Sequence, residues 1–138
     1  MTGFEVVEHA SDVGIRACGS SMSEAFENCA RGMMSLMLDL EKIRPERRVR
    51  LAAQGRERES LLVSWLSEIL YRVEAEGWAF RSFEVSEISD TSVRAWGTGE
   101  ALDPERHVTG AEIKAPTYHM LELREEKGRW TAQVIFDV

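Results

Sequence analysis

Residues 13–38 read VGIRACGSSMSEAFENCARGMMSLML, and the hydrophobic period changes within them. The first six residues alternate between apolar and other side chains, which is typical of a β-strand over 13–18. Apolar residues then recur every three or four positions, which predicts a helix over 22–38. Ser21 and Glu24 fit a capping box at its start. Its methionines suit a core-facing stripe or a flexible binding groove, and the helical spacing favours the core.

The same signals predict the elements on either side of this stretch. Residues 4–9 form a first strand, and a second amphipathic helix covers 58–75 and stops at Gly77. Further strands are predicted at 49–53, 80–88, 91–97, 112–115, 118–124 and 129–137. A polar loop opens at Asp103 and runs to Gly110.

This order of elements predicts an α+β fold. Residues 1–138 form a single domain, with a mostly antiparallel sheet, open or closed into a barrel, and two amphipathic helices packed on it. The strands come in hairpins and do not alternate with helices, which disfavours a doubly wound nucleotide-binding fold.

Composition narrows the class of protein. The chain has 138 residues, of which 43% are hydrophobic and 30% charged, and its net charge is −7. An acidic chain does not suit broad electrostatic binding to nucleic acid. The longest apolar run, GMMSLML at 32–38, is too short to span a bilayer, so no membrane association is expected. The first residues lack the features of a secretory signal, which indicates a cytoplasmic protein.

The two cysteines, Cys18 and Cys29, stand eleven residues apart and outside any CxxC motif. This spacing favours reduced, semi-buried thiols over a redox pair or a zinc site, which would need clustered ligands. The chain also lacks the phosphate-binding and hydrolase motifs GxxxxGK[ST], GxGxxG, HExxH and GxSxG.

A few carboxylates are candidates for a metal site. Asp12 stands in a polar connection between two predicted strands, where it either closes an Asx turn or offers a ligand. Asp137 and the terminal carboxylate of Val138 place two anionic groups at the tip of the last strand. If the second strand begins beside that tip, Asp12 adds a third carboxylate. Such hard oxygen ligands suit Ca²⁺, Mg²⁺ or Mn²⁺ rather than zinc.

Residues 112–119 contain further polar candidates. Glu112 and Lys114 share one face of the strand predicted there, so Lys114 serves either an ion pair or a function as a cation, and the ion pair is favoured. Tyr118 and His119 form a packed pair at the edge of the core or, alternatively, a hydrogen-bonding and titrating pair.

A basic stretch covers residues 41–58. It holds seven basic and three acidic residues, a net charge of +4, while the other 120 residues carry −11. Such a patch could contact RNA phosphates, but no aromatic residues are interleaved with it. A solvated face is therefore the favoured interpretation.

Six blocks of the sequence, taken in order, resemble the archease family. They are EHASDVGIRACG (8–19), SEAFENCARGMMSLMLDL (23–40), ESLLVSWLSEILY (59–71), LDPERH (102–107), EIKAPTYHML (112–121) and WTAQVIFDV (130–138). The resemblance covers essentially the whole chain, including its end at an aspartate followed by one aliphatic residue.

This resemblance implies a function. Archeases are non-catalytic protein cofactors that promote guanylylation and repeated turnover of the RtcB-type, GTP-dependent RNA ligase in tRNA splicing and RNA repair. The ligase is then the partner, and RNA is met only through it. The family carries a divalent cation, seen as calcium, at positions matching Asp12, Asp137 and Val138. Asp39 and Lys114 also fall on family-typical positions and are second-tier functional candidates.

Two other functions remain open from the residues. One is a metal-dependent phosphoester hydrolase that uses Asp12, Asp137 and His119, although no convincing nucleophile–base pair is present. The other is an RNA-binding or chaperone-like module that uses the basic patch at 42–58.

Overall fold

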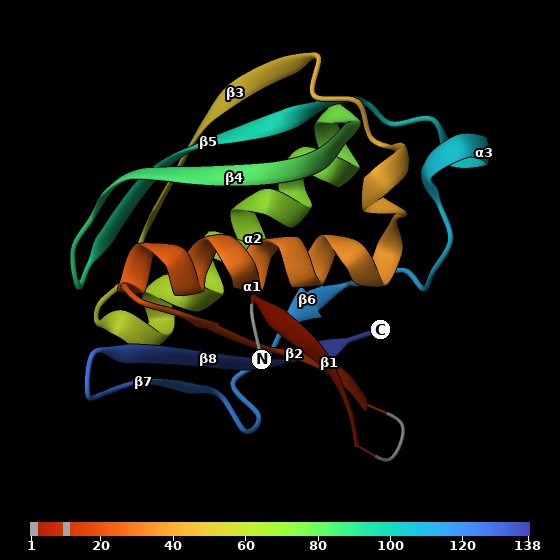
Figure 1. Cartoon of the computed structure of the whole chain (residues 1–138). Helices are drawn as coiled ribbons and strands as arrows, with labels where there is room; N and C mark the ends of the chain where they lie inside the picture. The colour runs from red at the N-terminus through yellow and green to blue at the C-terminus, as the bar shows by residue number, and fades with distance from the viewer. Residues whose placement is uncertain (1–2, 10–11) are drawn as a thin grey trace.

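The computed structural model describes residues 3–9 and 12–138, with only the backbone of His9. Two antiparallel sheets lie on opposite sides of a layer of helices (Figure 1). The main helices are α1 (Met22–Met37) and α2 (Arg58–Glu76), and the short ones are η1 (Leu40–Lys42) and α3 (Pro104–His107). The strands are β1 (Phe4–His9), β2 (Asp12–Gly19), β3 (Arg47–Gln54), β4 (Trp78–Ile88), β5 (Ser92–Ala101), β6 (Ala115–Pro116), β7 (Glu122–Glu126) and β8 (Arg129–Asp137).

The first and last parts of the chain form one sheet. Its order is β1-β2-β8-β6, and β7 also pairs with β8. Strand β8 is central and reads WTAQVIFD after its first residue, with five consecutive buried positions. A strand that is buried on both faces is expected to be apolar throughout rather than alternating. The middle of the chain forms the second sheet, in the order β3-β5-β4.

Helix α1 is covered by both sheets (Figure 1). Its buried residues occupy most of its circumference, including Ala25, Cys29, Gly32 and Met34. An apolar face this wide can pack against more than one neighbouring layer. At Gly32 an added Cβ would lie 2.7 Å from a methyl carbon of Ile15, so glycine allows β2 to approach the helix closely.

Helix α2 is fixed by its ends and by one indole group. A capping box joins Glu57 and Ser60 at its start, and Gly77 ends it with a φ of 70°. The indole N–H of Trp65, which is fully buried, donates to the carbonyl of Phe26 at 3.1 Å and ties α2 to α1.

The α+β class is confirmed, and the arrangement of its sheet is corrected. The strands form two sheets, and neither closes into a barrel within the part of the chain that the structure describes. The helices therefore lie between sheets, whereas the sequence predicted helices packed on one sheet. Strand periodicity predicts which face of a strand is buried but carries no information about which strands share a sheet.

The predicted boundaries fail mainly between residues 102 and 121. The strand predicted at 112–115 is confined to Ala115–Pro116, and the strand predicted at 118–124 begins only at Glu122. Residues 117–121 form a turn in which Met120 has a φ of 54°. The predicted polar loop contains α3, whose N-cap is Asp103. Backbone bonds to α1 and β8 fix these segments, and such long-range contacts leave no local pattern.

The helices are too short or too polar to cross a bilayer. This holds for every helix within residues 3–9 and 12–138.

Candidate functional site

The register of β2 on β8 brings two predicted metal ligands to the same end of the sheet. Val13 pairs with Phe136 as the last pair of this antiparallel ladder, and Asp12 and Asp137 are the next residues on the two strands. Strand β8 ends at Asp137, and Val138 follows as an exposed terminal residue. We name Asp12, Asp137 and Val138 the acidic tip. The sequence alone had left the proximity of Asp12 and Asp137 conditional.

The other side of β8 holds Lys114 at the same end. Ala115 pairs with Asp137, and the backbone N–H of Lys114 donates to the Asp137 carbonyl at 2.8 Å. Lys114 lies just before β6, so the prediction that it shares a strand face with Glu112 is wrong. Its side chain is exposed and forms no ion pair with any residue that the structure describes. The favoured ion-pair interpretation is therefore also wrong.

The donor set of the acidic tip fits a hard divalent cation. It offers two aspartate carboxylates and the carbonyl or carboxylate oxygen of Val138, all oxygen ligands. Asp12 is half-buried, while Asp137 and Val138 are exposed. Over the described ranges, no three side chains of the His, Cys, Asp and Glu types cluster as a metal site. A cation held here would thus need oxygen ligands besides these side chains.

Asp39 lies away from the acidic tip, at the other end of residues 108–114. Its carboxylate accepts from the backbone N–H of Glu41 at 3.2 Å and caps η1. Val108 forms a β-bridge with Leu38 beside it, whereas Lys114 contacts Asp137 at the other end. Residues 108–114, which we name the connecting segment, therefore join the end of α1 to the end of β8.

An apolar hollow of about 220 Å³ lies beneath the connecting segment. Its walls come from α1, α2 and the segment itself: Met37, Leu38, Leu70, Val73, Glu74, Leu102, Val108 and Gly110–Ile113. Ile113 is buried, so the segment is anchored by one apolar side chain as well as by backbone bonds.

Tyr118 and His119 do not form the packed pair that the sequence favoured. Tyr118 is 60% exposed, and His119 is also exposed in the turn before β7. Strand β8 fixes the start of this turn, because the hydroxyl and the backbone N–H of Thr117 both donate to the Ile135 carbonyl. Exposure leaves His119 available to solvent.

Both cysteines are buried, more fully than the semi-buried thiols that the sequence predicted. Burial raises the pKa of the Cys29 thiol to about 12. A thiol with that pKa is not a nucleophile at neutral pH.

A buried polar cluster was missed by sequence reasoning. The Glu100 carboxylate, 5% exposed, accepts from Arg106, from the backbone N–H of Arg44 and from Nε2 of His107. The Arg106 hydrogen bond, followed by that of Arg44, holds the pKa of Glu100 well below its usual range. Nδ1 of His107 accepts from the Asp103 N–H at 2.9 Å. The cluster fastens α3 to β5, and the block LDPERH is its only signal in the sequence.

The basic stretch at 41–58 is not a plain solvated face. The guanidinium carbons of Arg48 and Arg50 lie 3.9 Å and 4.7 Å from the ring centroid of Trp96. Arg47 stacks similarly on Trp78, at 4.9 Å. The aromatic residues that this stretch lacks come from the other two strands of the sheet, Trp96 from β5, where it pairs with Arg50, and Trp78 from β4.

Comparisons with known proteins place this geometry in a family. The Archease protein family matches residues 4–138. Protein archease of Methanosarcina mazei is 40% identical over 98% of this chain and 95% of its own length. Protein archease of Pyrococcus furiosus is 37% identical, with both chains covered completely.

Solved structures show the same relationship. The solution structure of Methanobacterium thermoautotrophicum protein 1598 is 33% identical, covers both chains completely and has a TM-score of 0.75. A Thermotoga maritima protein described as an archease and possible chaperone shares the fold, with a TM-score of 0.65 at 21% identity over 97% of this chain and 96% of that one. The chain therefore belongs to the archease family.

Proposed function

We propose that this protein is a non-catalytic activator of an RtcB-type, GTP-dependent RNA ligase in tRNA splicing and RNA repair. It promotes guanylylation and repeated turnover of the ligase through the acidic tip. One structural observation supports the proposal: the β2–β8 ladder ends at the Val13–Phe136 pair, so Asp12 and Asp137 follow it at the same end of the two strands. The description of the Thermotoga maritima relative as a possible chaperone supports a role exerted on another protein.

The acidic tip is suited to bringing a cation to a partner. Asp12, Asp137 and Val138 would hold a divalent cation, with calcium favoured over magnesium or manganese, and the bound cation would supply Lewis-acid chemistry. Because two of these residues are exposed, their oxygen atoms leave room for ligands from the ligase. Lys114, whose backbone N–H donates to the Asp137 carbonyl, would place a positive charge beside the cation site. We place this activity in the cytoplasm.

The test is a guanylylation assay with purified ligase, GTP and this protein. Asp12→Asn and Asp137→Asn each remove one negative charge and replace one carboxylate oxygen by an amide nitrogen at nearly constant volume, so both should abolish stimulation while the thermal unfolding midpoint stays near that of the wild type. Calcium titration by calorimetry should show binding to the wild type and its loss in both variants. This readout does not depend on the ligase.

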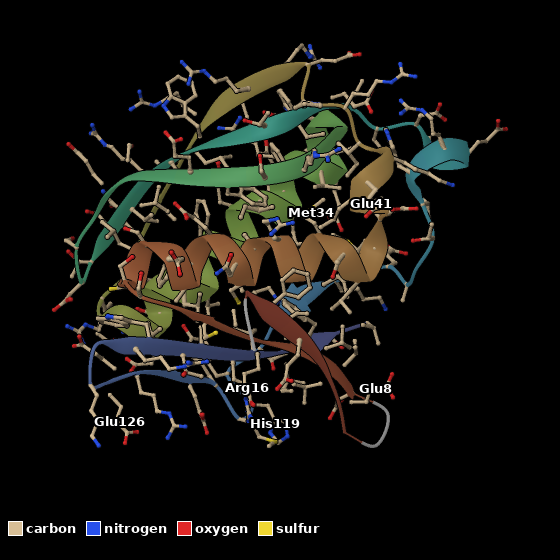
Figure 2. The ribbon with its side chains drawn as sticks, viewed as in Figure 1. Glu8, Arg16, Met34, Glu41, His119 and Glu126 are labelled. Atoms are coloured by element: carbon tan, nitrogen blue, oxygen red, sulfur yellow. The ribbon has the colours of Figure 1, made fainter. Side chains whose placement is uncertain are left out.

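Glu126→Gln is the matched control, because it removes the same charge at the opposite end of the five-stranded sheet from Glu8 and the acidic tip (Figure 2). It should stimulate guanylylation normally. Full stimulation by a folded Asp12→Asn variant would overturn the tip mechanism. Hydrolysis of a phosphoester by the protein without ligase, lost in the same variants, would favour the hydrolase alternative.

A further inference from the structure

The solvent face of β3 and β5 gathers arginines around one indole ring. Arg48 and Arg50 stack on Trp96, and Arg94 follows on the same face of β5, two residues from Trp96. We name these four residues the arginine face. We propose that the arginine face binds single-stranded nucleic acid through its phosphates, independently of the acidic tip.

Strand pairing fixes which way these side chains point. Arg50 pairs with Trp96 and Ala52 with Arg94, and paired residues share one face of an antiparallel sheet. The residues between them face the core, since Leu51 is 1% exposed and Ala95 is fully buried. Figure 2 shows nitrogen-tipped side chains projecting from β3, away from both helices. The arginine face is thus an outward surface on a rigid sheet.

The guanidinium groups of this face are not neutralised by ion pairs. Salt bridges in the described part of the chain engage Arg44, Arg58, Arg72 and Arg106 but not Arg48, Arg50 or Arg94. By contrast, the arginines that do form ion pairs hold elements together, as Arg106 does with Glu100. Positive charges stacked on an aromatic ring and left without a counter-charge are available to an anionic ligand.

Strand β4 contributes two carboxylates to the same face of the sheet. Glu84 pairs with the backbone of Trp96 from the other side of β5, and Glu87 pairs with Arg94. They limit the positive potential to the β3 side of the sheet. A narrow basic strip of this kind fits one phosphate backbone better than the broad surface of a duplex or a membrane.

Spacing and stacking favour a single strand. Arg48 and Arg50 lie two residues apart along a strand, so their backbones are about 7 Å apart. Their guanidinium carbons lie 3.9 Å and 4.7 Å from one ring centroid, so the two groups are close enough to bind consecutive phosphates. Arginine planes and aromatic rings are also the surfaces on which unpaired bases stack. Trp96 holds both guanidinium groups in place, which reduces the side-chain entropy that binding would otherwise cost.

Strand β3, the edge strand that carries Arg48 and Arg50, is hydrogen-bonded to helix α2 on its core side. The Arg72 guanidinium of α2 donates to the Arg50 carbonyl at 3.2 Å, and the carboxylates of Glu68 and Glu76 hold Arg72.

The net charge of −7 does not oppose this site strongly, because exposed charges beyond about 10 Å are screened at ordinary ionic strength. The protein would then bind RNA directly as well as through the ligase.

The test measures fluorescence anisotropy of a labelled 12-nucleotide single-stranded RNA against the whole protein, without ligase. Three phosphate contacts predict a slope of about −2 for log K against log[salt], at about 0.7 per contact. The double variant Arg48→Ala, Arg50→Ala should lower affinity about tenfold or more and bring the slope to about −0.7. The double variant Arg56→Ala, Arg124→Ala makes the same charge change at exposed positions elsewhere and should bind as the wild type does.

The role of the indole has its own variants. Trp96→Leu should weaken binding, and Trp96→Phe should restore most of it, because a phenyl ring still supports the guanidinium groups. Asp137→Asn should leave RNA binding unchanged, which separates this proposal from the ligase proposal. A slope that the Arg48 and Arg50 substitutions do not change, or equal affinity for a duplex of the same length, would overturn the proposal.

Discussion

Replacing Gly110 by alanine should disturb the acidic tip from a distance. Gly110 stands in the connecting segment, against the last turn of α1. A Cβ added there would lie 1.9 Å from the carbonyl oxygen of Leu36, and real Cβ atoms essentially never come within 3.0 Å of another atom. The two must therefore separate by at least about 1.1 Å, the difference between these distances. The obstacle is backbone within a packed helix, so the connecting segment has to move.

The movement reaches the acidic tip because the segment is bonded at both ends. The N–H groups of Thr109 and Gly110 both donate to the Met37 carbonyl at 3.2 Å, while that of Lys114 donates to Asp137. Overpacking of this kind costs about 1–3 kcal/mol of unfolding free energy. Part of the shift should pass to Lys114 and weaken the hydrogen bond from its N–H to the Asp137 carbonyl. Stimulation of the ligase should then fall by more than the loss of folded protein explains.

Gly128→Ala provides the comparison. Gly128 has a φ of 78°, and a Cβ added there would meet no atom within 4 Å, so alanine costs only backbone strain, about 1–2 kcal/mol. It lies in the β7–β8 turn, away from the tip. Urea unfolding, amide NMR shifts at residues 112–138 and guanylylation are measured for both variants. A Gly110→Ala variant that unfolds at the wild-type urea concentration and leaves the amide shift of Lys114 unchanged would refute this coupling.

Two further variants test the core and the buried cluster. Trp65→Phe removes the indole N–H bond to Phe26 and should lower the unfolding free energy by about 1–3 kcal/mol in urea titrations, whereas an unchanged midpoint would argue against the tie between the helices. Glu100 has a lowered pKa, so its stabilisation is complete above its unfolded pKa of 4.5 and is lost as the pH falls towards the lower folded value. Glu100→Gln should therefore unfold with a flatter pH dependence below about pH 5 than the wild type. The same pH dependence of the unfolding free energy in both proteins below about pH 5 would contradict this stabilising role of Glu100.

Local signals predicted most helices and strands well. The helix predicted at 22–38 is observed at Met22–Met37, and the one at 58–75 at Arg58–Glu76. The Ser21 hydroxyl accepts from the Glu24 N–H as a capping box requires, but the Glu24 carboxylate returns to Ser20 rather than Ser21. Hydrophobic period and capping depend on neighbours within four residues, so one sequence contains them.

Features that depend on pairing could not be predicted from the sequence alone. Trp96 and Arg50 are 46 positions apart in the chain, and only the β3–β5 register makes them neighbours. The same limit applied to Asp12 and Asp137, whose proximity depends on β2 lying beside β8. In each case the residue types could be read from the sequence, whereas only the order of the strands in the sheet brings the residues together.

The two proposed surfaces belong to different sheets, which allows them to be separated by mutation. The acidic tip depends on the register of β2, β8 and β6, and the arginine face depends on β3 and β5. The helices lie between these sheets, so a substitution on one outer face does not contact the other (Figure 1). Opposite charges on separate faces also keep the arginines from pairing with the tip carboxylates within one molecule. One chain can thus offer carboxylates to a protein partner while its arginines hold a nucleic-acid strand.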